Sequence, residues 1–263
     1  MIKKFHPARA HLLALCLSAA GAASAAPTLW VDDSAGKLGK VDVATGAVTL
    51  VGSMGVTMTD IAFDPSGNLY GISFSDLYSI NSTTAAITHI GSLGASLNSL
   101  VFGSDGTLYS ANNQLYTVST STGLASLIGS GGASYSSSGD LAFVGGNLYL
   151  SSTTPVSDSL VKLNLATGAG TDVGAIGTSG VFGLATNDNI TLYGVAGTDV
   201  YGINTATGAG ALLVNYSGHG LGAANGSAFL AEAAPPVPEP ATTALMLAGL
   251  ALVAGVAKRG RRA

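Results

Sequence analysis

The stretch that decides the fold is IAFDPSGNLYGISFSDLYSINSTTAAITHIG, residues 61–91, because its pattern recurs along the chain. A strand-like word appears five times, once as TLW (28–30) and four times as NLY or TLY, and its leucines are 40, 39, 40 and 44 residues apart. These leucines are Leu29, Leu69, Leu108, Leu148 and Leu192. A second word follows each one, in the forms DVATG, NSTTA, STSTG, NLATG and NTATG. Five copies in phase predict a repeat architecture.

Each word has a mechanical reason. The second word begins with a residue whose side chain folds onto the backbone to start a turn, and in four of five copies it ends in a glycine that supplies a positive φ. The turn-starting residues are Asp42, Asn81, Ser119, Asn164 and Asn204. Alternating segments such as LYSIN (77–81) and VYGIN (200–204) predict half-buried strands around these turns. A further strand carries IAF (61–63), LVF (100–102), LAF (141–143) or LAT (184–186).

Four short strands in a repeat of about 40 residues is the size of one propeller blade. We therefore predict an all-β domain over residues 26–234, built as a β-propeller of five blades, give or take one. The expected repeats cover residues 28–67, 68–106, 107–146, 147–189 and 190–229. A last strand at Ser227–Leu230 is expected to close the ring beside the N-terminal strand. The stretch FDPSGNLYG (63–71) resembles NHL-type propeller repeats, and an open sandwich or a β-solenoid is the structural alternative.

The composition of the chain excludes several classes of protein and of binding partner. The chain has 10 Lys and Arg against 14 Asp and Glu, and 37 glycines among 263 residues, which excludes a coiled coil and a disordered acidic tail. Between the termini the only basic residues are Lys37, Lys40 and Lys162, whereas the same stretch contains thirteen acidic residues. A partner with a phosphate backbone needs Lys and Arg, so we expect no nucleic-acid partner. Cations or neutral sugars fit this domain better.

The first 25 residues are typical of a secretory signal peptide. A basic start is followed by an apolar run and by the small residues Ala23 and Ala25 in an A-x-A pattern, where signal peptidase cleaves. Cys16 is the only cysteine, so the mature chain is expected to have no disulfide and no thiol nucleophile.

The last segment is organised as an anchor. A proline-rich linker (235–240) leads into 17 uncharged residues (241–257), the lower limit for a membrane-spanning helix. The basic tail (258–263) follows, and its charges are expected to stay in the cytoplasm and stop transfer. Those stop-transfer residues are Lys258, Arg259, Arg261 and Arg262. The plain alternative is an ordinary membrane anchor behind a linker.

The order of these parts closely resembles the PEP-CTERM sorting domain of Gram-negative bacteria. Its motif is carried here by Val237, Pro238, Glu239 and Pro240. The resemblance implies an exosortase that recognises the motif, cuts nearby, and releases or transfers the domain to the cell surface or beyond it. Such systems accompany exopolysaccharide production and biofilm. The same kind of tail also has an ice-binding label, because some ice-binding proteins carry it. That label describes those proteins and not this domain.

The sequence contains few candidate catalytic residues, and we expect no catalytic residues, no metal site and no cofactor. His89 occupies a slot that holds Leu50 in the first repeat and is expected to be a strand residue, whereas His219 lies on a glycine-rich turn. Asp60 and Asp140 precede equivalent strands, where other repeats have Ser99 and Gly183; Asp76 and Asp199 form a second such pair. Weak Ca²⁺ binding would have to use loop oxygens of Asp32, Asp33, Asp64 and Asp105.

Two function classes remain open. The favoured one is an exported, non-enzymatic propeller that is structural or adhesive and binds extracellular polysaccharide. The alternative is a carbohydrate-active hydrolase or lyase that uses paired aspartates and His219. A sialidase is disfavoured because no arginine lies between Arg9 and Arg259. Ice binding would need a flat threonine array, whereas Thr83 and Thr122 lie around turns.

Overall fold

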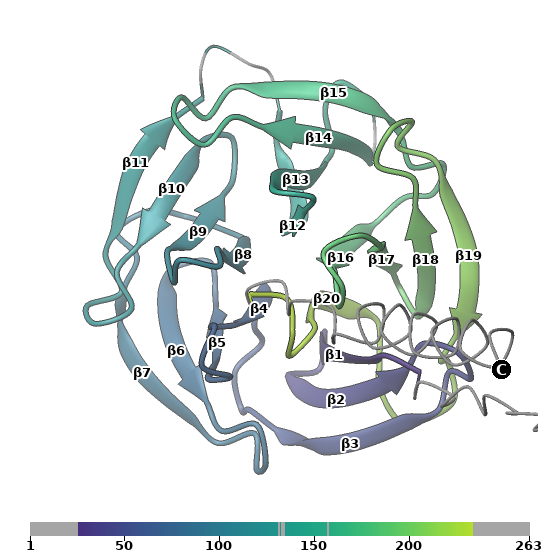
Figure 1. Cartoon of the computed structure of the whole chain (residues 1–263). Coiled ribbons are helices and arrows are strands. Elements are labelled where there is room, and N and C mark those ends of the chain that lie inside the picture. Colours follow the sequence, from purple (N-terminus) through teal and green to yellow (C-terminus); the bar gives the residue numbers. More distant parts are fainter. Residues whose placement is uncertain (1–25, 131, 133–134, 157, 234–263) are drawn as a thin grey trace, which may run out of the picture.

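Five antiparallel sheets of four strands surround a central axis in the computed structural model (Figure 1). The structure describes residues 26–130, 132, 135–156 and 158–233. This confirms the predicted all-β propeller and fixes the number of blades at five. The predicted signal peptide (1–25), the PEP motif and the helix at 241–257 lie outside the described residues. Among the residues that are described, no helix is long and apolar enough to cross a membrane.

Every blade has the same order of strands from the axis to the rim (Figure 1). Blade 1 contains β20 (Ala224–Ala228), β1 (Thr28–Asp33), β2 (Lys37–Asp42) and β3 (Val48–Ser53). Blade 2 contains β4 (Asp60–Phe63), β5 (Leu69–Ile72), β6 (Asp76–Ile80) and β7 (Ile87–Ser92). Blade 3 contains β8 (Ser99–Phe102), β9 (Leu108–Ala111), β10 (Leu115–Val118) and β11 (Ala125–Gly129). Blade 4 contains β12 (Ser137–Val144), β13 (Asn147–Ser152), β14 (Ser159–Leu163) and β15 (Gly170–Ala175), and blade 5 contains β16 (Val181–Ala185), β17 (Leu192–Ala196), β18 (Asp199–Ile203) and β19 (Gly210–Asn215).

The turn between the third and fourth strands of each blade forms as the second word predicts. In the copy at Asn204, the side-chain oxygen accepts hydrogen bonds from the amides of Ala206 and Thr207 at 2.9 and 3.1 Å. Gly208 then ends the turn with φ +80°. The copy that lacks a glycine places Ala85 at φ +61°, which L-residues adopt at a cost.

Ring closure joins the two ends of the propeller. β20 pairs with β1 in antiparallel register, with Trp30 opposite Ala228 and Asp32 opposite Gly226. The closing strand therefore lies beside the N-terminal strand, as expected, but it begins at Ala224 rather than Ser227. It takes the innermost position, which the IAF-type strands hold in the other blades. Each sheet thus starts one strand away from the start of its sequence repeat.

The core lies between neighbouring blades. Five clusters of buried apolar side chains join adjacent sheets, and all of them draw on residues between Leu29 and Ala233. Each blade buries little on its own, so burial requires its neighbours in the ring. Since the ring closes and fills its core within residues 26–233, these residues form a self-contained folding unit.

Candidate functional site

The strand directions give the ring two different faces. All five innermost strands begin on one face, called here the upper face, and end on the other, the lower face, because consecutive blades repeat the same path. β1 starts and β20 ends on the lower face, since Trp30 pairs with Ala228. The described chain therefore enters and leaves the propeller on the lower face.

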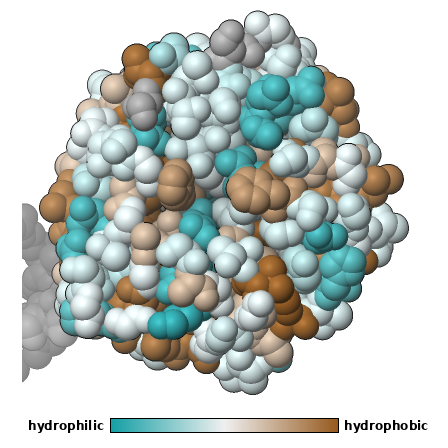
Figure 2. Space-filling view, turned by 180° about the vertical axis from the view of Figure 1, so that it is seen from behind, coloured by the Kyte–Doolittle hydropathy of each residue, from teal (hydrophilic) through white to brown (hydrophobic). Residues whose placement is uncertain are grey.

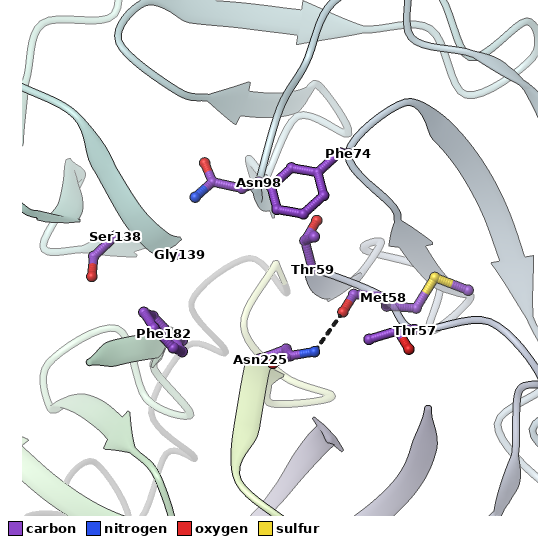
Figure 3. Close-up of a pocket in the computed structure, with 9 residues that line it drawn as sticks. All are labelled: Thr57, Met58, Thr59, Phe74, Asn98, Ser138, Gly139, Phe182 and Asn225. Carbon is purple, nitrogen blue, oxygen red and sulfur yellow. Dashed lines mark hydrogen bonds between the residues drawn. The ribbon is translucent and has the colours of Figure 1, made fainter. Parts of the chain in front are cut away.

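A pocket of about 300 Å³ opens at the axis on the upper face. Phe74 and Phe182 lie on opposite sides of it, one from the turn after β5 and the other from β16 (Figure 3). Their side chains are 60% and 40% exposed, which is unusual for phenylalanine. Apolar side chains also flank the middle of the ring in the space-filling view, among polar ones (Figure 2). The pocket is completed by Thr57, Met58, Thr59, Asn98, Ser138, Gly139 and Asn225.

Asn98 and Asn225 contribute amide side chains to this axial pocket from opposite sides (Figure 3). Asn225 donates to the carbonyl oxygen of Met58 at 2.9 Å, and Asn98 donates to the carbonyl oxygen of Ser137 at 3.2 Å. The Oδ1 atom of Asn98 is buried and has no partner among the described residues. The pocket therefore combines two aromatic faces with the amide and hydroxyl groups of its lining residues.

Two aspartates lie one position below the rim of this pocket. Asp60 begins β4 and Asp140 lies in β12, and both are fully buried. Each accepts a hydrogen bond at 2.5 Å from the innermost strand of the next blade, Asp60 from the amide of Leu100 and Asp140 from the amide of Leu184. Their carboxyl groups also hydrogen-bond to each other. The two amide hydrogen bonds join blade 2 to blade 3 and blade 4 to blade 5. The contact between the two carboxyl groups joins blades 2 and 4 across the axis.

Burial is the main cause of the unusual acidity at the axis. It raises the pKa of Asp60 and of Asp140 well above the ordinary value of aspartate, because the charged form loses its hydration. Burial also raises the pKa of Asp32 and Glu232, and the charge of Asp140 adds to both shifts. No other described residue donates a hydrogen bond to the carboxyl group of Asp32. Loss of hydration in this setting favours the neutral form of a carboxyl group over the charged form.

The aspartate pair does not have the geometry of a glycosidase. Glycosidase carboxyl groups are about 5 Å or more apart and reach the substrate, whereas Asp60 and Asp140 contact each other and are 0% exposed. The pair Asp76 and Asp199 is not brought together either, because the two lie at the starts of β6 and β18 in different blades.

The two histidines lie away from the axial pocket. His89 lies in β7, opposite Tyr78, and its Nε2 contacts Oδ1 of Asp76 at 3.1 Å. Its slot corresponds to Leu50 in β3, as the repeat predicts. His219 is exposed in the loop between β19 and β20 and does not line the pocket.

The four calcium candidates are dispersed. Asp33 accepts from the amides of Ala35, Lys37 and Gly222, so its oxygens hold the first blade in place. Asp64 and Asp105 accept backbone amides in their own turns. The part of the chain that the structure describes contains no group of three His, Cys, Asp or Glu side chains that could hold a metal ion.

Sequence reasoning missed the residues that make the axial pocket. Phe74 interrupts a turn that is otherwise SFSD, and Phe182 stands in VFGLA, where the buried side of the strand is carried by its neighbours. The signal that could have identified them is a large aromatic residue at a turn or on the outward side of a strand. Their meeting across the axis depends on ring closure.

The comparisons with known proteins bear first on the tail. Residues 236–262 match the family model described as the PEP-CTERM protein-sorting motif. The chain carries a PEP-CTERM sorting motif. This PEP-CTERM segment implies an exported protein that is anchored through its C-terminus and then processed by an exosortase. The match covers about a tenth of the chain, so it indicates how the protein is sorted and gives no information about the chemistry of the propeller.

Similarity to solved structures concerns the fold alone. A chain from a nidogen/laminin complex is 12% identical with a TM-score of 0.50, and the match covers 68% of this chain and 74% of that one. A structure described as "The de novo evolutionary emergence of a symmetrical protein is shaped by folding constraints" is 18% identical, covering 78% and 95%, with a TM-score of 0.46. A gluconolactonase from Xanthomonas campestris is 14% identical, covering 73% and 77%, with a TM-score of 0.45. Among curated proteins, none matches.

Proposed function

We propose that this exported propeller is a non-enzymatic glycan-binding component of the extracellular polysaccharide, and that it binds through the axial pocket. The observation that carries the proposal is the pair of exposed aromatic rings, Phe74 and Phe182, which face each other across a pocket that is also lined by amide and hydroxyl side chains. Aromatic faces stack on the apolar sides of sugar rings, and amide oxygens accept hydrogen bonds from hydroxyl groups.

The charge of the lining supports a neutral sugar. Among the described residues, no lysine or arginine lines the axial pocket, and the carboxyl groups beneath it are buried. An anionic polysaccharide would need cationic partners. The lack of an exposed acid pair in the pocket supports binding without bond cleavage.

The position of the pocket fits the proposed sorting. The chain leaves the propeller on the lower face, and the axial pocket opens on the upper face. A membrane-spanning tail would therefore hold the pocket away from the bilayer. After exosortase processing, the same face is free to contact the polysaccharide at the cell surface or beyond it.

The test uses residues 26–234 and exopolysaccharide purified from the producing organism, measured by co-sedimentation. We expect binding, with an at least tenfold loss in Phe74→Ser/Phe182→Ser, while the length of the polysaccharide chains stays constant. Leu212→Ser is the matched control, because Leu212 is 58% exposed on the rim strand β19. Equal binding by the double variant would refute the axial site, and shortened chains would show an enzyme instead.

A further inference from the structure

The seams between blades on the lower face share a recurring aromatic contact. The third residue of the NLY-type word contacts an aromatic side chain at the lower end of the next blade's innermost strand. The ring centroids are 5.3 Å apart for Tyr70 and Phe102 and 5.7 Å apart for Tyr109 and Phe143. Trp30 with Phe63 and Tyr193 with Phe229 form the same contact, at 5.3 and 5.1 Å.

Two of these seams open into equivalent pockets. The pocket between blades 2 and 3 has a volume of about 330 Å³ and is lined by Tyr70, Phe102 and Thr120. The pocket between blades 3 and 4 has a volume of about 390 Å³ and is lined by Tyr109, Phe143 and Leu165. These residues correspond one to one in the repeats. Both pockets also contain Ser104 and Asp105, which lie between them.

The other three seams are closed by specific contacts. The amine of Lys40 lies 4.3 Å from the ring centre of Trp30 and covers that seam. Between blades 4 and 5, the longer loop of blade 5 reaches across, and Asn189 accepts from the amide of Gly145 at 2.9 Å. Tyr193 is buried beside Phe229. The two seams that stay open are therefore distinct from the rest of the ring.

The open pockets have a polar rim above an aromatic floor. Asp64 accepts from the amide of Asn68 at 2.8 Å, and Asp105 accepts from the amide of Thr107 at 3.0 Å, so turn geometry fixes both carboxylates. No described residue hydrogen-bonds to the hydroxyl of Tyr70. Burial, followed by the charge of Asp64, raises the pKa of Tyr70. Neither pocket is lined by a lysine or arginine from the part of the chain that the structure describes.

We propose that each of these two inter-blade pockets binds one sugar residue of a neutral glycan on the lower face. The sugar ring stacks on the tyrosine, and its hydroxyl groups donate to the carboxylate at the rim. The idea deepens the proposed function, glycan binding, by adding sites that are separate from the axial pocket. A propeller with sites on both faces cross-links two polysaccharide chains rather than holding one.

The test titrates residues 26–234 calorimetrically with cellohexaose, laminarihexaose, mannohexaose and chitohexaose. Ser104→Arg is the blocking variant, because Ser104 is exposed, lines both pockets and has no packing role. Ser121→Arg is the matched control on an exposed turn of the same blade and face, outside both pockets. Phe74→Ser/Phe182→Ser removes the axial site, so the two faces are measured independently.

We expect at least one hexasaccharide to bind the axial double variant, with an association constant at least tenfold lower once Ser104→Arg is added. Ser121→Arg should leave binding unchanged. The proposal is overturned if none of the four probes binds the axial double variant, or if Ser104→Arg binds as tightly as Ser121→Arg. Loss of binding only in the axial variants would leave the proposed function standing and remove the lower-face sites.

Discussion

Side chains at the position directly before the IAF-type word of each innermost strand decide how closely the blades approach the axis. Around the ring, this position is held by Asp60, Ser99, Asp140, Gly183 and Gly226. Aspartate alternates with a smaller residue around the ring. Because the number of positions is odd, two of the smaller residues, Gly183 and Gly226, are neighbours. A Cβ on Gly226 would collide with Oδ1 of Asp60 and lie 2.7 Å from Oδ1 of Asp32. The space that glycine leaves is filled by the carboxyl group of Asp60 from blade 2 and by that of Asp32 from β1 of the same blade.

The raised acidity at the axis predicts a pH dependence of stability. Because the folded-state pKa values of Asp60 and Asp140 exceed the unfolded value of about 3.9, the stabilisation is complete below that value and is lost as pH rises through the folded pKa values. Asp60→Asn lets an amide donate to Asp140 without a shared proton. We therefore expect a flatter decline of the free energy of unfolding between pH 5 and 8 than in the wild type, measured by urea denaturation.

The control for this experiment is Asp42→Asn. Asp42 is exposed in a turn, and its pKa is lowered by hydrogen bonds from Thr45 and Ala44, so its stabilisation is lost only as pH falls below about 4. This variant should keep the wild-type slope between pH 5 and 8. A slope in Asp60→Asn as steep as in the wild type would contradict the shared proton.

At the scale of the element, the rim of the ring is built from one contact repeated between blades. Every fourth strand has a bulge opposite the third strand, for example between Val200 and Tyr201 of β18 and their partners in β19. The turn glycine of one blade packs against the backbone beside the bulge of the preceding blade. Gly208 lies against the carbonyl group of Gly174 in β15, and Gly123 lies against that of Gly91 in β7. The glycine in this word therefore serves both the turn and the seam.

Comparison of two glycines separates these roles. Gly208 and Gly106 have nearly the same φ, +80° and +83°, but a Cβ on Gly106 would meet nothing within 4 Å. Gly106→Ala should cost only the left-handed conformation, about 1 kcal/mol. Gly208→Ala adds a backbone clash of about 1–3 kcal/mol. Thermal unfolding should show a loss of midpoint for Gly208→Ala at least twice that for Gly106→Ala, and equal losses would argue against the seam contact.

At the scale of the molecule, the pairing of β20 with β1 completes the first blade and closes the ring. Without β20, the edge of β1 would be open and unpaired, and few charges are present to prevent edge-to-edge pairing. Two apolar clusters would also lose members, including Phe229 and Ala228. The stability of the whole domain therefore depends on its last strand.

Two truncations test the closure. A chain that ends at residue 223 lacks β20 and should lose its cooperative thermal transition and aggregate. A chain that ends at residue 233 keeps the complete ring and should unfold at the same midpoint as residues 26–234. Circular dichroism melts with light scattering measure both properties. Cooperative unfolding of the shorter chain would show that four complete blades and an open sheet suffice.

The sequence by itself determined the strand type, the period and the turn chemistry, because these are local properties. Words such as NTATG report the hydrogen bonds of their own turn, and the recurrence of Leu29, Leu69 and their equivalents reports the number of blades. The tail is equally local, and its motif at 236–262 was readable without a fold.

Only the tertiary structure decided which residues meet at the axis and along the seams. Phe74 and Phe182 are 108 residues apart, and Asp60 and Asp140 are 80 residues apart, yet each pair faces the same axis. Asp60 and Asp140 hold equivalent positions two repeats apart, but the repeat alone does not say which equivalent positions meet across the ring. Phe74 and Phe182 hold different positions within the repeat, so no spacing rule links them. Which seams stay open was equally hidden, since it depends on whether Lys40 or the loop at Asn189 reaches across to a neighbouring strand or blade.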